Sequence, residues 1–425
     1  MKVYFVTLGC KLNQSETERL AREFARAGHQ VVLSPREADL CVVNSCAVTR
    51  AAARRSRQVA RRARRANPRI VTVLTGCYAE VAPEAASGIE GVALVVGNRD
   101  KERLLEILAD RGYGAESPVP YPSPLFHTRA FVKIQDGCNM GCAFCIIPLA
   151  RGRERSRPSS EIIAEIRDLV AAGHKEIVLT GVQLSAYGRD GAAGPKASLR
   201  DLVARILDQT GVARLRLSSL APWTLNPSLL ALWGDPRLCR HLHLSLQSGS
   251  DAVLRRMRRP YTTARYAGAV EMARGMIPDL AITSDVIVGF PGETEAEFQE
   301  GLRFVERMAF ARLHVFRYSP RPGTKAASMP HQVPHDVKQA RSQAMIELGR
   351  RSAERFRRQF LGRRLDVLWE TREGDRWTGF TDNYIRVTTE SSLDLSNTIT
   401  PVELMGLTEE GMWGRVAAEG RFPGD

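Results

Sequence analysis

The sequence predicts an α/β protein in three parts: an open α/β domain, a partial barrel of six βα units, and a small β-barrel. Two observations predict this fold class. Short apolar runs alternate with helical patterns up to about Arg350, and the pattern then changes to short strand-like runs separated by turns. The 425 residues are enough for several domains with buried cores. We divide the chain into domains at residues 1–112, 129–357 and 358–425, with a linker at 113–128.

The first domain is predicted to be an open and mostly parallel sheet, because apolar runs and helical patterns take turns along it. The predicted strands are Val3–Leu8, Leu40–Val43, Ile70–Leu74 and Val92–Val96, and the predicted helices lie around Glu16–Ala27, Ala51–Ala66 and Lys101–Leu108. The stretch that follows, Tyr113–Pro124, carries four prolines and little periodicity, which is typical of a linker.

Six further strand-like runs, each next to a helical pattern, predict a partial barrel, short of the eight units of a closed one. They are Ala130–Gln135, Glu176–Thr180, Ala213–Ser218, His241–Leu246, Ala281–Val288 and Arg312–Phe316. In several runs polar residues alternate with apolar ones, as His241, His243, Ser245 and Gln247 do with leucines. Since helices cover the outside of such a barrel, polar rows indicate a lumen that holds a ligand. The alternative is an amphipathic sheet with one face in solvent.

The C-terminal part is predicted to be a small, OB-like β-barrel. An arginine-rich helical stretch, Val337–Gln359, leads into it. Its predicted strands are Asp366–Trp369, Trp377–Phe380, Tyr384–Thr388 and Trp413–Val416. A segment of about 65 residues with this pattern is compatible with a nucleic-acid-binding module.

Charge and cysteine content indicate the kind of partner and the compartment. The net charge of +14 comes from 61 Lys and Arg against 47 Asp and Glu, which favours a polyanionic partner. No apolar run approaches the roughly 18 residues of a membrane-spanning helix. The N-terminus also lacks the features of a secretory signal, so we expect a cytoplasmic protein without a membrane partner. In that reducing compartment the eight cysteines favour metal, cluster or catalytic use over disulfides.

Three cysteines form a compact motif directly after the first strand of the middle domain. Cys138, Cys142 and Cys145 have C-x3-C-x2-C spacing, in a loop at the end of the barrel where such folds carry their active site. Zinc sites and ferredoxin-type clusters normally use four protein ligands, whereas three leave one iron of a [4Fe-4S] cluster open to another ligand. The spacing alone also occurs in zinc sites.

A second set of cysteines is dispersed along the first domain. Cys10, Cys46 and Cys77 each lie at the end of a predicted strand. Because parallel strands end at one edge of the sheet, we expect these three thiols to converge there. The alternative is three ordinary buried cysteines, which is how we interpret Cys41 and Cys239.

These motifs resemble those of the radical S-adenosylmethionine superfamily, and the two triads together resemble its methylthiotransferase family. The resemblance covers nearly the whole chain. It includes TGVQLSAYG from Thr180, HLSLQSGSDAVLRRM from His243, SDVIVGFPGETEAEF from Ser284 and FRYSPRPGTKA from Phe316. It implies that the middle domain is a radical enzyme and that the C-terminal barrel is a TRAM module that binds RNA.

The resemblance also implies two [4Fe-4S] clusters and S-adenosylmethionine as cofactors. Cys138, Cys142 and Cys145 would hold the radical cluster, and Cys10, Cys46 and Cys77 the auxiliary cluster. One S-adenosylmethionine would give a methyl group to sulfur at the auxiliary cluster. A second would be cleaved to a radical that activates C2 of an adenine. An electron donor such as flavodoxin or ferredoxin would take part, as could a sulfur donor.

The opening TLGCKLNQSET from Thr7 and GFTDNYIRV from Gly379 resemble one branch of the family. That branch acts on N6-threonylcarbamoyladenosine at position 37 of tRNA, next to the anticodon, and gives 2-methylthio-N6-threonylcarbamoyladenosine. The branch acting on isopentenyladenosine usually opens with GCQMN, from which Lys11 and Leu12 depart. A third branch modifies an aspartate of a ribosomal protein. The cysteine motifs are also compatible with a radical enzyme of another reaction type and with a non-catalytic RNA-binding protein whose thiolates hold zinc.

Further residues are predicted to bind the cofactor and the RNA. Gln247 and Ser218 lie on polar strand faces and Gln183 follows the second strand, so we expect them to contact S-adenosylmethionine. A helix between Cys46 and Cys77 is rich in arginine, which favours phosphate binding. In the C-terminal module charge and aromatic stacking could hold RNA. The predicted RNA-binding residues are Arg54, Arg57, Arg61, Arg64, Arg363 and Tyr384. The same patterns would arise from ordinary polar residues of a barrel, a solvated helix and core aromatics.

Overall fold

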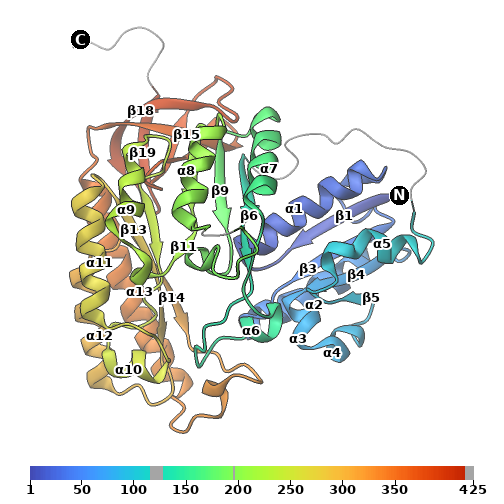
Figure 1. The fold of residues 1–425 in the computed structure, drawn as a ribbon, viewed down its shortest axis with the longest axis horizontal. Coiled ribbons are helices and arrows are strands. Elements are labelled where there is room, and N and C mark those ends of the chain that lie inside the picture. Colours follow the sequence, from blue (N-terminus) through green and yellow to red (C-terminus); the bar gives the residue numbers. More distant parts are fainter. Residues whose placement is uncertain (115–127, 195–196, 417–425) are drawn as a thin grey trace.

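The computed structural model describes residues 1–114, 128–194 and 197–416, and it contains the three predicted parts. An N-terminal α/β sheet lies beside the middle domain, and a C-terminal barrel lies across one end of the middle domain (Figure 1). Most of the predicted linker at 113–128 lies outside the described residues. The predicted fold class is confirmed.

The N-terminal domain is a five-stranded parallel sheet in the order β2-β1-β3-β4-β5. Its strands are β1 (Lys2–Thr7), β2 (Gln30–Val32), β3 (Leu40–Ser45), β4 (Val71–Gly76) and β5 (Val92–Val96). Its helices are α1 (Lys11–Arg26), α2 (Arg50–Ala66), α3 (Cys77–Val81), α4 (Pro83–Ser87), the 3-10 turn η1 (Lys101–Arg103) and α5 (Leu104–Ala109). The central strand β3 is buried along its whole length, because helices cover both faces of the sheet.

Two local predictions in this domain need correction. Strand β2 was not predicted, because three residues are too short to carry a period. Helix α1 begins at Lys11 and not at Glu16, so Lys11, Asn13 and Glu16 all belong to its first turns. Asn13 and Glu16 are buried there, and polar residues that are buried against another domain hide the start of a helix from an amphipathic pattern.

The middle domain is a partial barrel of six strand positions. One sheet has the order β10-β9-β6 and another the order β11-β12-β13-β14, and only Ser218 separates β10 from β11. Its strands are β6 (Arg129–Lys133), β9 (Glu176–Thr180), β10 (Arg214–Leu217), β11 (Ser219–Leu220), β12 (His241–Leu244), β13 (Ala281–Val288) and β14 (Arg312–Arg317), with a hairpin of β7 (Gln135–Asp136) and β8 (Arg155–Ser156) beside them.

Helices cover the outer face of this barrel (Figure 1). The helices are α6 (Ile147–Arg151), α7 (Ser159–Ala171), α8 (Leu199–Gln209), α9 (Pro227–Leu230), α10 (Asp251–Arg256), α11 (Thr263–Met276), α12 (Glu295–Met308) and α13 (His335–Arg358), with 3-10 turns η2 (Leu184–Ala186), η3 (Pro222–Thr224), η4 (Ala231–Gly234) and η5 (Lys325–Ser328). Apolar strand residues such as Leu215, Leu242 and Ile282 join the helices in one core. The polar residues that alternate with them contact one another across neighbouring strands, as His241 does with Thr283 (3.0 Å). The lumen is therefore polar.

The C-terminal part is a closed barrel in the order β15-β16-β17-β19-β18. Its strands are β15 (Arg364–Glu373), β16 (Arg376–Thr381), β17 (Arg386–Glu390), β18 (Ile399–Leu407) and β19 (Met412–Val416). Trp369 and Trp377 are fully buried in its core, so neither can stack on RNA. Strand β18 was not predicted, because Pro401 and Gly406 interrupt its pattern. Tyr384 precedes β17 instead of starting it and has a positive φ of 66°.

This barrel closes the end of the middle domain at which the strands begin. From the start of β10, Arg214 donates to the carbonyl groups of Phe380 (3.0 Å) and Asp366 (2.8 Å). Arg240, directly before β12, forms an ion pair with Asp382 (2.6 Å). The opposite end of the middle domain, where its strands terminate, carries the cysteine loop.

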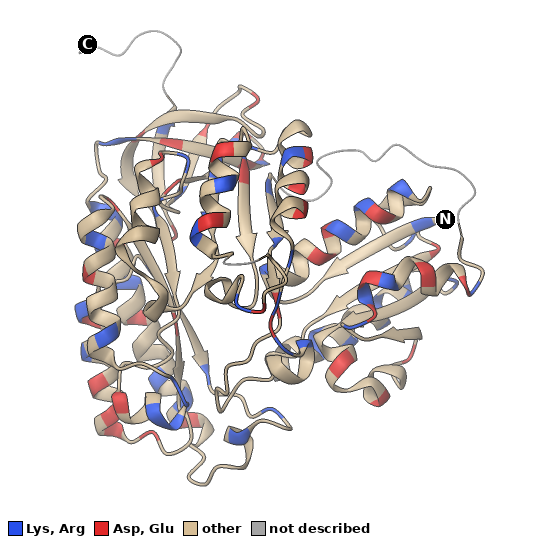
Figure 2. Ribbon diagram, in the orientation of Figure 1, with Lys and Arg blue, Asp and Glu red and all other residues tan. Residues whose placement is uncertain are grey.

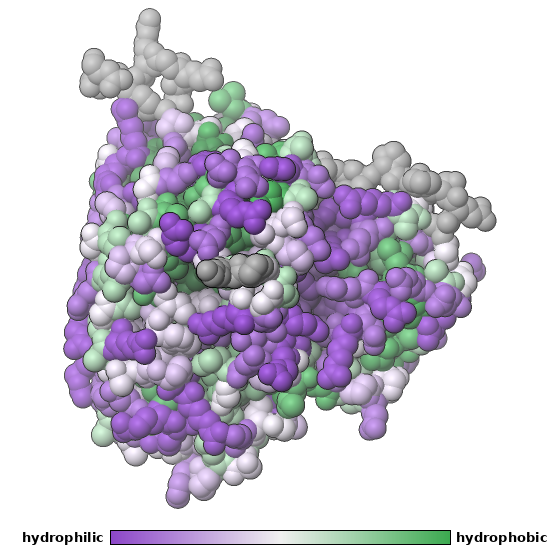
Figure 3. All heavy atoms as spheres, viewed as in Figure 1, coloured by the Kyte–Doolittle hydropathy of each residue, from purple (hydrophilic) through white to green (hydrophobic). Residues whose placement is uncertain are grey.

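Charges of both signs are mixed on the outer helices, whereas hydrophilic side chains concentrate in one region of the surface. Basic and acidic residues are interspersed along the outer helices of the middle domain (Figure 2). In Figure 3 hydrophilic side chains gather where the N-terminal domain meets the middle domain. Among the described residues, no helix combines the length and the apolar character needed to cross a membrane.

The contact between the first two domains contains a buried carboxyl group with a testable effect on stability. Glu18 of α1 is buried near Phe131 of β6, and burial raises its pKa to about 8. Between about pH 4.5 and pH 8 the unfolded chain has lost this proton while the folded chain keeps it, so folding becomes less favourable as the pH rises. We expect Glu18→Gln to stabilise the protein by up to about 4 kcal/mol at pH 8 and by little at pH 4.5.

Urea unfolding of the wild type and Glu18→Gln between pH 4.5 and pH 8.5 measures this effect. The difference in the free energy of unfolding between the two proteins should grow with pH and level off above pH 8. Two parallel curves would show that Glu18 ionises normally in the folded protein.

Candidate active site between two cysteine triads

The loop after β7 brings Cys138, Cys142 and Cys145 together at the carboxyl ends of the barrel strands. Burial is the main cause that raises the pKa of the Cys145 thiol to about 12, and the neighbouring Cys142 and Cys138 add to the rise. The loop is pinned from both sides: Ala143 donates to the carbonyl of Met257 (3.0 Å) and accepts from the amide of Ala326 (2.8 Å). The structure thus presents three thiols on a fixed loop.

One arginine provides positive charge beside this triad. Arg259 donates to Cys142 Sγ (3.1 Å), and its guanidinium lies over the rings of Trp223 (5.4 Å) and Tyr261 (5.1 Å). Cluster-bound cysteines are thiolates, so a guanidinium within hydrogen-bond distance suits a cluster site. The donor set fits a [4Fe-4S] cluster with one open iron, because the described cysteines offer no fourth thiol here.

Cys10, Cys46 and Cys77 also converge, at the carboxyl edge of the N-terminal sheet. Burial raises the pKa of Cys46 to about 11, and Cys77 and Cys10 both contribute to the rise. The glycines before two of these cysteines are needed for the approach. Gly9 has φ +102°, and a Cβ there would lie 2.8 Å from Cys46 Sγ. Gly76 has φ +94°, and a Cβ there would lie 2.5 Å from the carbonyl oxygen of Ser45.

The short helix α6 lies between the two triads. It begins at Ile147, two residues after Cys145, and its Ala150 packs into the core of the N-terminal domain. Asn98 donates both to Cys77 Sγ (3.6 Å) and to the carbonyl of Ala150 (2.7 Å). The next residue, Arg151, lowers the pKa of both Cys10 and Cys46, against the larger opposite effect of burial. The two triads therefore share one helix as a wall.

Arg151 also anchors a buried ionic network that joins the two domains. It contacts Glu16 (2.8 Å) and Asp136 (2.9 Å) and donates to Asn13 Oδ1 (2.6 Å). Lys101 and Lys133 complete the network at Glu16 (2.7 and 3.3 Å). Burial by itself would raise the pKa of Glu16, but the three cations hold it well below its usual range.

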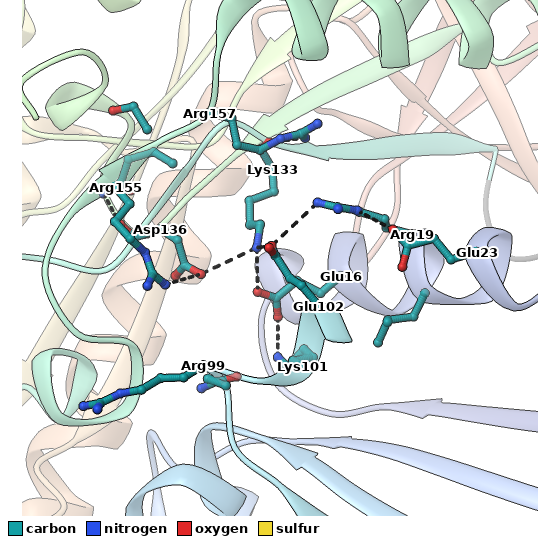
Figure 4. A pocket seen from close by; sticks show the side chains of 14 residues that line it. Glu16, Arg19, Glu23, Arg99, Lys101, Glu102, Lys133, Asp136, Arg155 and Arg157 are labelled. Carbon is teal, nitrogen blue, oxygen red and sulfur yellow. Dashed lines mark hydrogen bonds and ion pairs between the residues drawn. The ribbon is translucent and has the colours of Figure 1, made fainter. Parts of the chain in front are cut away.

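The same network forms one wall of a polar cavity of about 280 Å³. Figure 4 shows Lys133, Glu16, Glu102 and Lys101 pointing toward one another, with Arg155 reaching Asp136. The hydrophilic surface where the N-terminal and middle domains meet thus continues into charged contacts that hold the two domains together.

The three residues predicted to bind S-adenosylmethionine lie at the carboxyl ends of their strands. Gln183 lies beside Cys138 (Oε1 to Sγ, 3.7 Å), and its Nε2 is buried without a hydrogen-bond partner among the described residues. The buried Ser218 Oγ likewise has no described partner. Gln247 has a positive φ of 70° and is held by hydrogen bonds with Asp285 and Ile287 (2.8 Å each). Buried polar atoms with no partner near a thiol triad fit a polar ligand such as S-adenosylmethionine.

The floor of the lumen is strongly charged. Arg216 and Glu176 form a fully buried ion pair (2.6 Å), and Arg129 pairs with Glu370 of the C-terminal barrel (2.5 Å). Tyr384 inserts from the C-terminal barrel, and its ring lies 4.7 Å from that of His241. Burial would raise the pKa of Tyr384, but nearby cations outweigh it and lower the value to about 8.

The residues predicted to bind RNA divide into two groups. Arg54, Arg61 and Arg64 are exposed on α2, and Arg57 is half-buried against Tyr78 (3.3 Å). Arg363 pairs with Asp279 (2.5 Å), and Tyr384 faces the barrel floor and not an outer surface. The packing stripe of α2 consists of Ala53, Ser56, Ala60 and Ala63.

Sequence analysis did not identify three residues of this site: Lys11, Arg151 and Arg259. Lys11 alone had a usable signal: it follows Cys10 directly, and it is one of the two residues that depart from the GCQMN pattern. Arg151 and Arg259 lie among many other arginines, and nothing in their neighbours along the chain distinguishes them.

The partial barrel, its cysteine loop and the free polar atoms beside that loop define a radical S-adenosylmethionine enzyme. Two protein families match the chain: Radical SAM superfamily over residues 132–305, and Uncharacterized protein family UPF0004 over residues 2–97. Among solved structures, the radical S-adenosylmethionine methyltransferase TsrM from Kitasatospora setae has a similar fold. Its TM-score is 0.57 at 14% identity, and the match covers 77% of each chain.

Curated relatives identify the family more closely. Threonylcarbamoyladenosine tRNA methylthiotransferase MtaB from Bacillus subtilis is 40% identical, over 95% of this chain and 93% of its own. The tRNA-2-methylthio-N(6)-dimethylallyladenosine synthase of Thermobifida fusca is 38% identical, over 87% of this chain and 78% of its own. The chain belongs to the tRNA methylthiotransferases of the radical S-adenosylmethionine superfamily.

Proposed function

We propose that this enzyme inserts a methylthio group at C2 of N6-threonylcarbamoyladenosine at position 37 of tRNA. The observation that carries the proposal is the meeting of two cysteine triads across α6, where the lumen of the barrel opens. The 40% identity to the threonylcarbamoyladenosine tRNA methylthiotransferase of Bacillus subtilis, over 95% of this chain, supports the threonylcarbamoyl substrate.

The proposed division of labour follows the three domains. Residues 1–112 would hold the auxiliary [4Fe-4S] cluster through Cys10, Cys46 and Cys77. Residues 129–357 would hold the radical cluster through Cys138, Cys142 and Cys145, and S-adenosylmethionine through Gln183, Ser218 and Gln247. Residues 358–425 would be the TRAM module.

When bound, these cofactors supply the radical and the sulfur chemistry, and the chain provides position and charge. Arg259 and Arg151 each place a guanidinium beside one triad and offset the negative charge of its thiolates. The contact between the two domains through Arg151 holds the two cysteine triads in a fixed position relative to each other. Closure of the barrel floor by Tyr384 and its neighbours limits the access of water from that end. Cleavage of S-adenosylmethionine consumes an electron, so the proposal includes a donor such as flavodoxin or ferredoxin, and also a sulfur source.

The proposed tRNA contact is the exposed face of α2. None of its arginines at 54, 55, 57, 61, 62, 64 and 65 has an ion pair among the described residues, whereas several arginines of the outer helices of the middle domain are paired. Like charges on one helix repel, and phosphates would neutralise them. We expect Arg54→Gln/Arg61→Gln/Arg64→Gln to weaken tRNA binding and to lower the slope of log affinity against log salt by up to about 0.9 for each lost phosphate contact.

A matched variant controls for net charge. Arg103, Arg350 and Arg358 are exposed and paired with glutamates of their own or a neighbouring turn. Changing all three to Gln should leave the salt slope nearly unchanged. Filter binding of tRNA at several salt concentrations gives the salt slope of each variant. Equal slopes for the α2 variant and the control variant would show that α2 does not contact the tRNA.

The function is tested by mass spectrometry of nucleosides from total tRNA of a host without this activity, with and without the gene. Appearance of 2-methylthio-N6-threonylcarbamoyladenosine is the expected result. If only the isopentenyl analogue gains a methylthio group, the substrate is isopentenyladenosine and the enzyme belongs to the branch that acts on it. If no methylthio nucleoside forms while the purified protein carries two clusters, a ribosomal-protein aspartate becomes the substrate. If the purified protein is colourless and contains zinc, the proposal that it is a radical enzyme is wrong.

A further inference from the structure

A cationic side chain without an anionic partner lies inside the barrel. Lys11 is the first residue of α1, and its ammonium lies 5.5 Å from the ring centre of Tyr384 on the barrel floor. Its charge also lowers the pKa of His241 on β12 and of His314 on β14, with burial as the larger cause in both cases. An N-terminal side chain thus reaches the inner walls of the middle domain.

Two other cations of the floor already have carboxylate partners. Arg216 is paired with Glu176 and Arg129 with Glu370. Within the described parts of the chain, Lys11 has neither an ion pair nor a hydrogen bond to a carboxylate. Removing an ammonium from water costs free energy unless a counter-charge compensates. Lys11 is therefore a cation inside the barrel that no carboxylate of the described residues neutralises.

The position of Lys11 indicates which anion this is. Lys11 adjoins Cys10, and the proposed reaction brings C2 of the adenine to the triad that contains Cys10. In adenine, C2 and C6 both adjoin N1, so with C2 at the triad the N6 substituent would leave the ring beside the triad, where Lys11 adjoins Cys10. The threonylcarbamoyl group ends in a carboxylate, which is the only anion on the modified base. An isopentenyl group is apolar and would leave the ammonium without a partner.

We infer that Lys11 is a specificity-determining residue that binds the carboxylate of the threonylcarbamoyl group at the floor of the barrel. The inference rests on the proposed function and specifies how the substrate is selected. A hydrogen bond to a charged group of this kind accounts for about 10- to 100-fold in affinity.

The test uses two anticodon stem-loops, one with threonylcarbamoyladenosine and one with its neutral carboxamide analogue. Their affinities for the cluster-loaded enzyme are measured by fluorescence anisotropy, and methylthio product is measured separately. The wild type should bind the acid about 10- to 100-fold more tightly than the amide. Lys11→Met should bind both as weakly as the wild type binds the amide. Lys11→Arg should recover part of the difference.

Lys2→Met is the matched control, because Lys2 is exposed on β1 and its loss removes the same charge. It should preserve the preference of the wild type. Two results would overturn the inference: equal binding of acid and amide by the wild type, or an equal loss for both stem-loops in Lys11→Met, which would assign Lys11 to a backbone phosphate. If the wild type forms no methylthio product, the proposed function fails, while the binding ratios still decide the role of Lys11.

Discussion

Replacing Cys142 with alanine is expected to abolish reductive cleavage of S-adenosylmethionine, because a cluster held by three thiolates loses one of them. Replacing Cys46 should leave that cleavage in place and abolish methylthio insertion. Each variant should contain roughly four irons per chain in place of roughly eight. Iron and sulfide analysis gives the cluster content, and chromatography of 5′-deoxyadenosine and of the modified nucleoside separates the two steps.

Cys41→Ala is the control for this pair. Cys41 is buried inside β3 and belongs to the core of the sheet, so its loss should preserve both clusters and both products. If Cys46→Ala kept its iron and its methylthio product, the N-terminal triad would be structural. If Cys142→Ala still cleaved S-adenosylmethionine, the assignment of the radical cluster would be wrong.

Arg151→Met is expected to be the most destabilising single change in the contact between the first two domains. It removes the shortest ion pair of Asp136, the hydrogen bond to Asn13 Oδ1 and one of three cations from Glu16. Loss of one member of a buried ionic network costs about 3–5 kcal/mol. Urea unfolding measures the loss. Because Arg151 lies beside the Cys10 triad, the variant should also retain less iron in the proposed auxiliary cluster.

Arg99→Met tests whether burial of the ionic network causes the large loss of stability expected for Arg151→Met. Arg99 pairs with Glu80 at 3.3 Å, but its side chain is 76% exposed, and such pairs contribute about 1 kcal/mol or less. Equal losses in Arg99→Met and Arg151→Met would show that water reaches the network and screens it.

The fold class and both groups of cysteines could be predicted from the chain alone. Strand and helix periods repeat within a few residues, so the six strand positions of the middle domain and its polar lumen are visible in the order of residue types. Position at strand ends was enough to predict that Cys10, Cys46 and Cys77 converge, since parallel strands share an edge. Short or interrupted strands such as β2 and β18 could not be predicted, because their patterns are too weak.

Which charged residues meet depends on how the domains pack. Lys11 and Tyr384 come from opposite ends of the chain and face each other because the C-terminal barrel closes the floor while α1 enters from the side. Arg151 and Glu16 are 135 positions apart in the sequence, and they meet because the N-terminal and middle domains pack together. An arginine in a solvated helix and one in a buried network look alike in sequence. Burial and the partners that domain packing provides distinguish the two, because they determine whether its charge is screened by water or must be neutralised by another group.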